Sequence, residues 1–429
     1  MVQTLAGCFT VPSFVTFQHL LAGWTLCLDR HTVTGVLRAS GAVGKKHHTS
    51  FHRFFRQARW CLDTVGLCLL SLVVKLVPED EPVVLAVDDT LGRHTGKHIS
   101  AASMHHDPLL STRNKPVFHW GHVWVVLAVV VRVPLWDKRF ALPVLARLYR
   151  AEKLCKKTRR SFHKKTELAG EMIALVAIRL PGRQIRVLGD NAYANRSVVR
   201  CLAGNTHFIG RGRPDAALYA LPQKQRMGRP RHKGVRLPSP AQYARNPDGW
   251  REVVVRVYGR KVHVRVKVVD ALWYSVGRDR LMRFVIVRGW PGHKDDDVLC
   301  TTDVSLKPEE VIEYYCMRWS LEVTFHEVKG RLGFEDPQNR TERAVERTAP
   351  MALVTYTLVV TWYLTVGRAS RAALLLDLPW YTKVVPSFSD MLATLRRETW
   401  SHRLSQTSTS PRAQQKSLAP LLQAVGYAA

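Results

Sequence analysis

Residues 314–329 read YYCMRWSLEVTFHEVK, and the spacing of the polar side chains in this stretch predicts an α-helix with one chemically distinct stripe. At 3.6 residues per turn, the four side chains of this stripe fall within about 60° of one another. They are Tyr315, Arg318, Glu322 and Lys329. An acid flanked by cations and a phenol suits divalent-metal chemistry on a phosphodiester.

A neighbouring apolar stripe predicts how this helix packs. Its members recur at i, i+4, i+7 and i+11, which is the spacing of one helix face. They are Leu321, Phe325, Val328 and Leu332. We therefore expect the helix to bury the apolar stripe and to present the polar stripe at the edge of the core.

Two further acidic positions follow apolar runs that are typical of strands. Asp88 and Asp89 come directly after the run 83–87, and Asp190 follows a short run and one glycine. Mg²⁺ prefers oxygen ligands, and two such ions can activate an attacking oxygen and stabilise a leaving one. Each acid alone is more often a turn, cap or solvated residue. Only their combination with Glu322 predicts a metal site.

The charge of the chain indicates its partners. The 429 residues include 64 Lys and Arg against 34 Asp and Glu, a formal net charge of +30. This length allows two to four domains with a sizeable core. An excess of positive charge this large indicates nucleic acid as the first candidate partner and a membrane surface as the second. A generally basic soluble protein is the alternative.

The cysteines and the apolar runs narrow the class of protein. The eight cysteines form no CxxC pair and have no His at zinc-finger spacing, which favours a reduced, cytosolic protein without structural zinc. The N-terminus lacks the basic and long apolar regions of a secretory signal. We interpret the apolar runs 123–131 and 351–366 as a buried strand and a core helix, not as membrane spans.

The patterns along the chain predict an α/β architecture in four parts. Residues 1–78 read as an N-terminal helical domain, either a DNA-end-binding domain or a helical cap on the next domain. Residues 79–211 and 301–370 supply the strands and helices of a catalytic core, which a β-rich basic insertion at 212–300 interrupts. Residues 371–429 are expected to serve dimerisation or to be partly disordered.

The insertion is the most basic part of the chain. It has 19 Lys and Arg against 8 Asp and Glu. A clear period-2 pattern over Glu252–Val269 predicts antiparallel strand. The segment Lys224–Arg236 contains six cations and no acid, and we expect it to bind DNA phosphates. The residues assigned to this role are Lys224, Arg226, Arg229, Arg231 and Lys233.

The spacing Tyr315-x2-Arg318-x3-Glu322-x6-Lys329 resembles the Tyr-Arg-Glu-Lys signature of bacterial insertion-sequence transposases of the DDE class. All four positions match that signature. The resemblance covers about residues 80–366 of the chain.

Two further motifs support the resemblance. LAVDDTL at 85–91 is similar to the first-Asp motif of the family, and VLGDNAY at 187–193 is similar to the second. The β-rich insertion between the second Asp and the Glu also matches. Because the first Asp of the family is followed closely by Thr or Ser, Asp89, adjacent to Thr90, is preferred over Asp88.

The resemblance implies a ribonuclease H-like mixed sheet with flanking helices. It implies two Mg²⁺ or Mn²⁺ ions held by Asp89, Asp190 and Glu322, with Asp88 as the alternate to Asp89. It also implies cut-and-paste transposition by a homodimer on double-stranded DNA, which comprises inverted-repeat ends and target DNA. The N-terminal helical domain is similar in position to the DNA-end-binding domains of the family.

The resemblance also implies that Tyr315, Arg318 and Lys329 contact DNA phosphates near the cleavage site. Elementary chemistry agrees, because these groups are donors or cations and a guanidinium can hold a phosphate with two hydrogen bonds. Related enzymes with such an insertion can flip a base onto an aromatic side chain, and stacking is worth about 1–3 kcal/mol per base. Base-stacking candidates here are Trp273, Tyr274 and Trp290, with a place in a small β core as the alternative for each.

The favoured function is that of a DNA transposase that binds element ends, cleaves them and joins the 3′ ends to target DNA. One alternative is a catalytically inactive descendant that only binds DNA. Another is a metal-dependent nuclease that cuts without joining, because it would use the same core. The expected location is the cytoplasm of a prokaryote, in association with the nucleoid and with no membrane partner.

Overall fold

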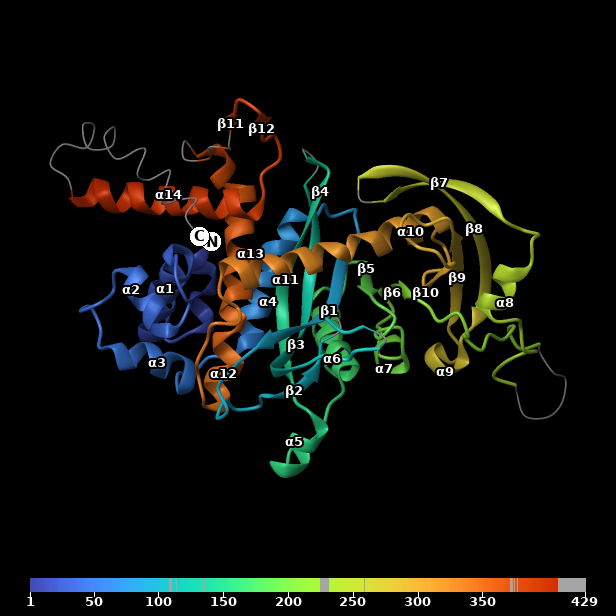
Figure 1. Cartoon of the computed structure of the whole chain (residues 1–429), viewed down its shortest axis with the longest axis horizontal. Coiled ribbons are helices and arrows are strands. Elements are labelled where there is room, and N and C mark those ends of the chain that lie inside the picture. The colour runs from blue at the N-terminus through green and yellow to red at the C-terminus, as the bar shows by residue number, and fades with distance from the viewer. Residues whose placement is uncertain are drawn as a thin grey trace.

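One large mixed sheet runs through the molecule and is covered by helices (Figure 1). The computed structural model describes residues 1–107, 110–112, 114–133, 136–223, 231–257, 259–370, 373, 375 and 377–407. Within these residues the fold is α/β, as the sequence predicts.

The sheet has ten strands in the order β2-β3-β1-β5-β6-β10-β9-β8-β7, and β4 also pairs with β3. β1 pairs antiparallel with β3 and parallel with β5, and β5 pairs parallel with β6. The strands are β1 (Val83–Arg93), β2 (Ser103–His106), β3 (Phe118–Val133), β4 (Lys138–Tyr149), β5 (Ile185–Gly189), β6 (Thr206–Arg211), β7 (Arg251–Val257), β8 (Arg260–Leu272), β9 (Leu281–Arg288) and β10 (Asp297–Thr301).

The strands of the segment 212–300 continue this sheet, because β10 pairs with β6 and leads on to β9, β8 and β7. The alternation over residues 252–269, which predicts antiparallel strand, is divided between β7 and β8 as an antiparallel hairpin. Gly259 lies in the turn at φ 80°, a left-handed backbone conformation that glycine adopts without steric cost. Two short helices flank these strands, α8 (Pro240–Arg245) and α9 (Tyr274–Gly277).

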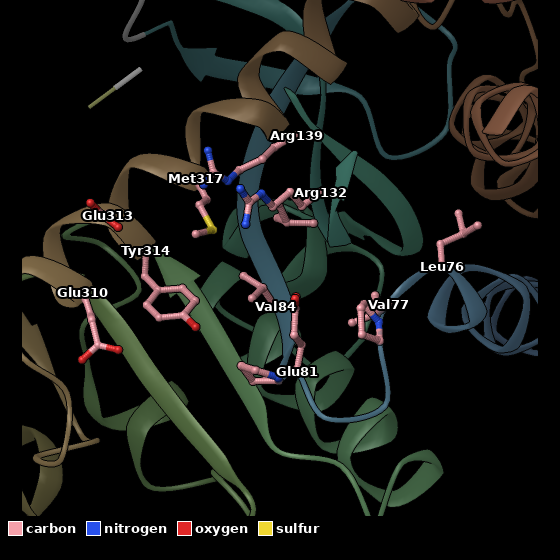
Figure 2. A pocket seen from close by; sticks show the side chains of 13 residues that line it. Leu76, Val77, Glu81, Val84, Arg132, Arg139, Glu310, Glu313, Tyr314 and Met317 are labelled. Atoms are coloured by element: carbon pink, nitrogen blue, oxygen red, sulfur yellow. The ribbon is translucent and has the colours of Figure 1, made fainter. Parts of the chain in front are cut away.

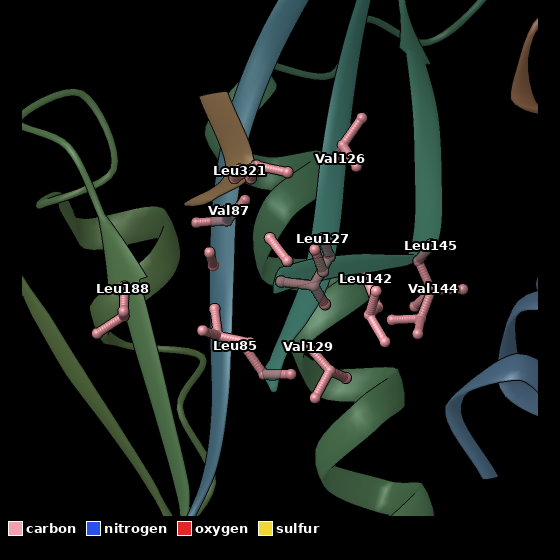
Figure 3. Packing of buried hydrophobic residues seen from close by; sticks show 14 of the residues in the cluster. Leu85, Val87, Val126, Leu127, Val129, Leu142, Val144, Leu145, Leu188 and Leu321 are labelled. Atoms are coloured by element: carbon pink, nitrogen blue, oxygen red, sulfur yellow. The ribbon is translucent and has the colours of Figure 1, made fainter. Parts of the chain in front are cut away.

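The centre of the sheet is buried on both faces. β3 is apolar and buried over most of its length, as expected for a strand with helices on both sides. Figure 3 shows Leu85 and Val87 of β1 beside Leu127 of β3 and Leu142 of β4. Leu321, from the predicted apolar stripe, lies in the same cluster (Figure 3) and is fully buried.

The N-terminal residues are helical, as predicted. They form η1 (Val2–Cys8), α1 (Val11–Leu26), α2 (Val33–Ser40), α3 (His48–Arg56), α4 (Leu62–Val73) and η2 (Val74–Leu76). This module packs directly on the core: Trp24 Nε1 donates to the carbonyl of Leu332 at 3.0 Å, and Arg347 donates to the carbonyl of Ala58 at 2.9 Å. These contacts fix the module against the core. Arg53 and Arg56 on the outer face of α3 are nevertheless exposed.

The remaining helices cover the sheet. They are α5 (Glu152–Lys157), α6 (Lys165–Arg179), α7 (Arg196–Val199), α10 (Pro308–Met317), α11 (Trp319–Arg331), α12 (Glu342–Thr348), α13 (Pro350–Thr365) and α14 (Phe388–Thr407), with η4 (Gly367–Ala369) and the small hairpin β11 (Asp377–Leu378) and β12 (Tyr381–Thr382). α13 is the predicted core helix and is buried along nearly all its length. Within the described ranges, no helix combines the length and apolarity needed to cross a membrane.

The C-terminal segment is more ordered than the sequence suggests over residues 388–407. α14 packs on α13 and α1, with Met391 buried. Arg396 is also buried, and it donates to the carbonyls of Thr25 at 2.8 Å and Cys27 at 3.1 Å. The stretch 408–429, which includes the Ser/Thr-rich tail, lies outside the described residues.

Candidate active site at the junction of two helices

The predicted single helix is two helices that meet at Arg318. α10 ends at Met317 and α11 begins at Trp319. Arg318 itself keeps helical dihedral angles, φ −54° and ψ −35°, so the polar side chains on both sides of the junction stay close in direction. The guanidinium carbon of Arg318 lies 5.8 Å from the ring centre of Tyr315.

Arg318 bridges two of the predicted acids. Its Nη1 donates to Oδ2 of Asp88 at 2.8 Å, and its Nη2 lies 2.8 Å from Oε1 of Glu322. The side chains of Arg318 and Asp88 are 15% and 16% exposed, whereas the side chain of Glu322 is 33% exposed. A single guanidinium thus holds a strand carboxylate and a helix carboxylate together at the edge of the core.

Asp190 completes the acidic group. It directly follows β5, as predicted, and its Oδ1 accepts the backbone N–H groups of Ala192 at 2.8 Å and Tyr193 at 3.3 Å. Burial raises the pKa of Asp88 to about 7 against the opposing effect of Arg318, and the charges of Asp190 and Asp89 add to the rise. The parallel register of β1 and β5, in which Ala86 pairs with Leu188, brings Asp88 level with Asp190, so the charge of Asp190 disfavours the ionised form of Asp88.

Asp89 has different partners from Asp88. The sequence suggested that the acid pair follows the end of a strand. β1 in fact extends through Arg93, so the pair lies within the strand. Because successive side chains of a strand point to opposite faces, the two carboxylates diverge. Oδ2 of Asp89 lies 2.7 Å from Nζ of Lys165, and its Oδ1 accepts the hydroxyl of Tyr193 at 3.1 Å. The geometry thus groups Asp88, rather than the preferred Asp89, with the other acids.

Lys329 lies apart from this group. Its Nζ donates to the carbonyl of Leu91 at 2.7 Å and lies 3.8 Å from Oε1 of Glu335. Eleven residues of helix separate it from Arg318, which is about 16 Å at 1.5 Å per residue. The structure therefore brings Tyr315, Arg318 and Glu322 together and places Lys329 further along the same helix.

The predicted DNA-binding cations of the insertion are only partly described. Lys224, Arg226 and Arg229 lie outside the described residues. Arg231 and Lys233 are exposed, and the Nζ of Lys233 lies 4.0 Å from the ring centre of Tyr219.

The base-stacking candidates are less accessible than the prediction requires. Trp273 and Trp290 are 4% and 5% exposed, so neither offers a free ring face as placed. Tyr274 is half-buried, with Nζ of Lys233 at 5.4 Å from its ring centre. Trp319, which the sequence analysis did not select, is 50% exposed next to Arg318. Its exposure follows from its helix position beside the polar stripe, which the periodicity alone could have indicated.

The described residues line several cavities near the sheet, and two of them bear on the site. One, of about 480 Å³, adjoins the loop after Asp190 and is lined by Asn191, Asn195, Arg213 and Trp273, among others. The other, of about 390 Å³, lies under α10 beside Arg132, Arg139 and Met317 (Figure 2). Neither Asp88, Asp190 nor Glu322 lines the second cavity, so it is separate from the acidic group.

The acids fit a hard cation by chemistry but are not assembled around one. In the described part of the chain, no three His, Cys, Asp or Glu side chains have the spacing of a metal site. Arg318 occupies the position between Asp88 and Glu322 instead. Carboxylate oxygens are nevertheless the donors that Mg²⁺ and Mn²⁺ prefer, and a buried acid beside two others is a site where a cation would be favourable.

Comparison with known proteins agrees with this chemistry. The family described as DDE superfamily endonuclease matches residues 4–274, more than half of the chain. The match includes both aspartate motifs and the N-terminal helical module, and it ends before Glu322. No curated protein matches the chain significantly. On the strength of the family match, the chain belongs to the DDE superfamily endonucleases.

Proposed function

We propose that this protein is a DNA transposase that binds the ends of its element, cleaves them with divalent metal ions and joins the 3′ ends to target DNA. Membership of the family implies a DNA substrate and metal-dependent nuclease or transposase chemistry. The observation that supports the proposal most is the bridge from Asp88 through Arg318 to Glu322, with Asp190 beside it.

The sheet order supports a ribonuclease H-like core. Along β4-β3-β1-β5-β6, β3 is antiparallel to both β4 and β1, and β5 and β6 run parallel to β1. The acids lie in the middle of β1, after β5 and on α11, so three separate elements contribute them. A mixed sheet of this kind supports the ribonuclease H-like core that we propose from the resemblance.

We propose Asp88, Asp190 and Glu322 as the metal ligands, in place of the set that contains Asp89. Two Mg²⁺ or Mn²⁺ ions at such a site would polarise the phosphodiester and activate the attacking oxygen. Arg318 would then exchange its carboxylate partners for a DNA phosphate. Its Nε is buried without a hydrogen-bond partner among the described residues, so it has a free donor for such an acceptor.

The remaining parts of the proposal concern DNA and assembly. Tyr315, Arg318 and Lys329 would contact DNA phosphates, and the exposed Arg53 and Arg56 of α3 support end binding by the N-terminal module. A homodimer on paired inverted-repeat ends, and a place with the nucleoid, follow from the resemblance.

The test uses the full chain with DNA that carries the sequences flanking its coding region and a supercoiled target plasmid. We expect cleavage at the element ends and joined products with Mg²⁺ or Mn²⁺, and neither with EDTA. Cleavage without joining would identify the metal-dependent nuclease. Specific end binding without either reaction would identify the inactive descendant.

Binding should depend steeply on salt because of the +30 charge. Each phosphate contact contributes about −0.9 to the slope of log K against log salt, since binding releases counterions. Reversing the charges of Lys224, Arg226, Arg229, Arg231 and Lys233 should flatten the slope by about 0.9 per lost contact. Fluorescence anisotropy at several salt concentrations measures this. An unchanged slope would show that these cations do not touch DNA.

A further inference from the structure

Asp89 is held by two side chains that the proposed chemistry does not use. Lys165, in the first turn of α6, places its Nζ 2.7 Å from Oδ2. Tyr193 donates its hydroxyl to Oδ1 at 3.1 Å and is itself only 1% exposed. Both carboxylate oxygens of Asp89 therefore have a donor, which suits a structural anion better than a ligand that must bind a cation.

Tyr193 also contacts the other aspartate. Its backbone N–H donates to Oδ1 of Asp190 at 3.3 Å, next to the 2.8 Å bond from Ala192. These bonds occupy Oδ1 and leave Oδ2 without a hydrogen-bond partner among the described residues. One residue thus links Asp190, through its backbone, with Asp89 on β1, through its side chain.

The backbone at this point allows little freedom. A Cβ on Gly189 would lie 2.9 Å from Cβ of Tyr193, closer than real Cβ atoms approach, and 3.0 Å from the ring of Phe208, which is a very tight contact. The end of β5 is therefore pressed against Tyr193, whose ring is packed in the core. A small residue at 189 and a large, hydrogen-bonded one at 193 fix the loop between them.

We propose that Tyr193, Asp89 and Lys165 form a clamp that positions the carboxylate of Asp190 beside Asp88. The proposal rests on the proposed function, because the clamp acts by preparing Asp190 to bind a metal ion. It explains the doubled acid of LAVDDTL: Asp88 is the ligand, and Asp89 is the anchor for the loop that carries the next ligand. All three are positioning residues, since none needs to touch the DNA.

The experiment measures Mn²⁺ binding to the full chain without DNA, by titration calorimetry. Tyr193→Phe removes the hydroxyl that binds Asp89 and keeps the ring and the backbone N–H that binds Asp190. Because the loop that orients Asp190 loses its anchor, we expect Mn²⁺ affinity to fall by about 10-fold, the lower end of the cost of disturbing the outer contacts of a metal site. Tyr356→Phe is the matched control, because it removes another buried hydroxyl, 3.3 Å from Oγ1 of Thr324. It should bind Mn²⁺ like the wild type.

Cleavage gives a second reading. The Mn²⁺ concentration for half-maximal cleavage should rise in Tyr193→Phe, and the rate at saturating Mn²⁺ should recover toward that of the wild type. Should Tyr193→Phe fail to fold, Asp89→Asn tests the same clamp and is expected to weaken Mn²⁺ binding.

The outcomes separate the clamp from the function. Wild-type affinity in folded Tyr193→Phe or Asp89→Asn, together with lost binding in Asp88→Asn, would overturn the clamp alone. A wild-type chain that binds no Mn²⁺ would overturn the clamp and the metal-dependent function together.

Discussion

Asp88→Asn should lower metal-dependent DNA cleavage by about 1000-fold or more, because a metal ion at the reacting phosphate is worth several kcal/mol. Asp190→Asn and Glu322→Gln should have similar effects, and DNA binding should stay nearly unchanged because no phosphate contact is removed. Single-turnover cleavage and anisotropy on the same DNA measure the two quantities. Wild-type cleavage by Asp190→Asn or Glu322→Gln would refute the proposed ligand set.

The pair Asp88 and Asp89 gives the sharpest comparison. Asp88 shares Arg318 with Glu322, whereas Asp89 is bound by Lys165 and Tyr193. We therefore expect Asp89→Asn to keep measurable cleavage that extra Mn²⁺ increases, and the much slower cleavage by Asp88→Asn not to be restored by extra Mn²⁺. The reverse result would restore Asp89 as the ligand, as its neighbour Thr90 suggests from the sequence.

Leu321→Ala should lower stability and Arg318→Ala should lower cleavage, because the two residues lie on different faces of the same helix. Leu321 is fully buried, and its truncation should lower the free energy of unfolding by about 2–5 kcal/mol through cavity formation. Arg318→Ala should lower cleavage about 100-fold, since misplacing reacting groups by about 1 Å has that cost. Melting temperature and single-turnover cleavage, measured on both variants, check this.

Arg318→Lys is the control for charge. It keeps the positive charge but lacks the planar fork that now holds two carboxylates, so cleavage should remain impaired. A result in which Arg318→Ala melts like a core variant while Leu321→Ala is stable and inactive would mean that the DNA meets the other face of the helix.

Local periodicity predicted the parts of the site that depend on one element. The apolar stripe through Leu321 and Val328 is buried, because the 3.6-residue repeat determines which side chains share a helix face. The position of Asp190 after β5 follows equally from an apolar run that ends in a glycine. In both cases the sequence pattern and the structural feature that it predicts involve residues that are close together in the sequence.

Periodicity was less informative about where strands end and about contacts between segments that are far apart in the sequence. The alternation over 252–269 changes phase at the turn, from Val253, Val255 and Val257 to Val262, Val264 and Val266, but the period alone does not say that the two halves pair as a hairpin around Gly259. The burial of Trp273 and Trp290 depends on strands and helices from distant parts of the chain. The packing of residues 388–407 depends on α1, which lies hundreds of residues earlier in the sequence, and on α13, which lies tens of residues earlier.

The sequence by itself determined the α/β class and the apolar helix face through Leu321, and its net charge of +30 indicated a nucleic-acid partner. Only the tertiary structure distinguished Asp88 from Asp89. In a strand covered on both faces, alternation assigns adjacent side chains to opposite sides but does not say what lies on each side. Arg318 comes to one side from the helix junction and Lys165 to the other from α6, and those long-range contacts give the two neighbouring carboxylates different surroundings.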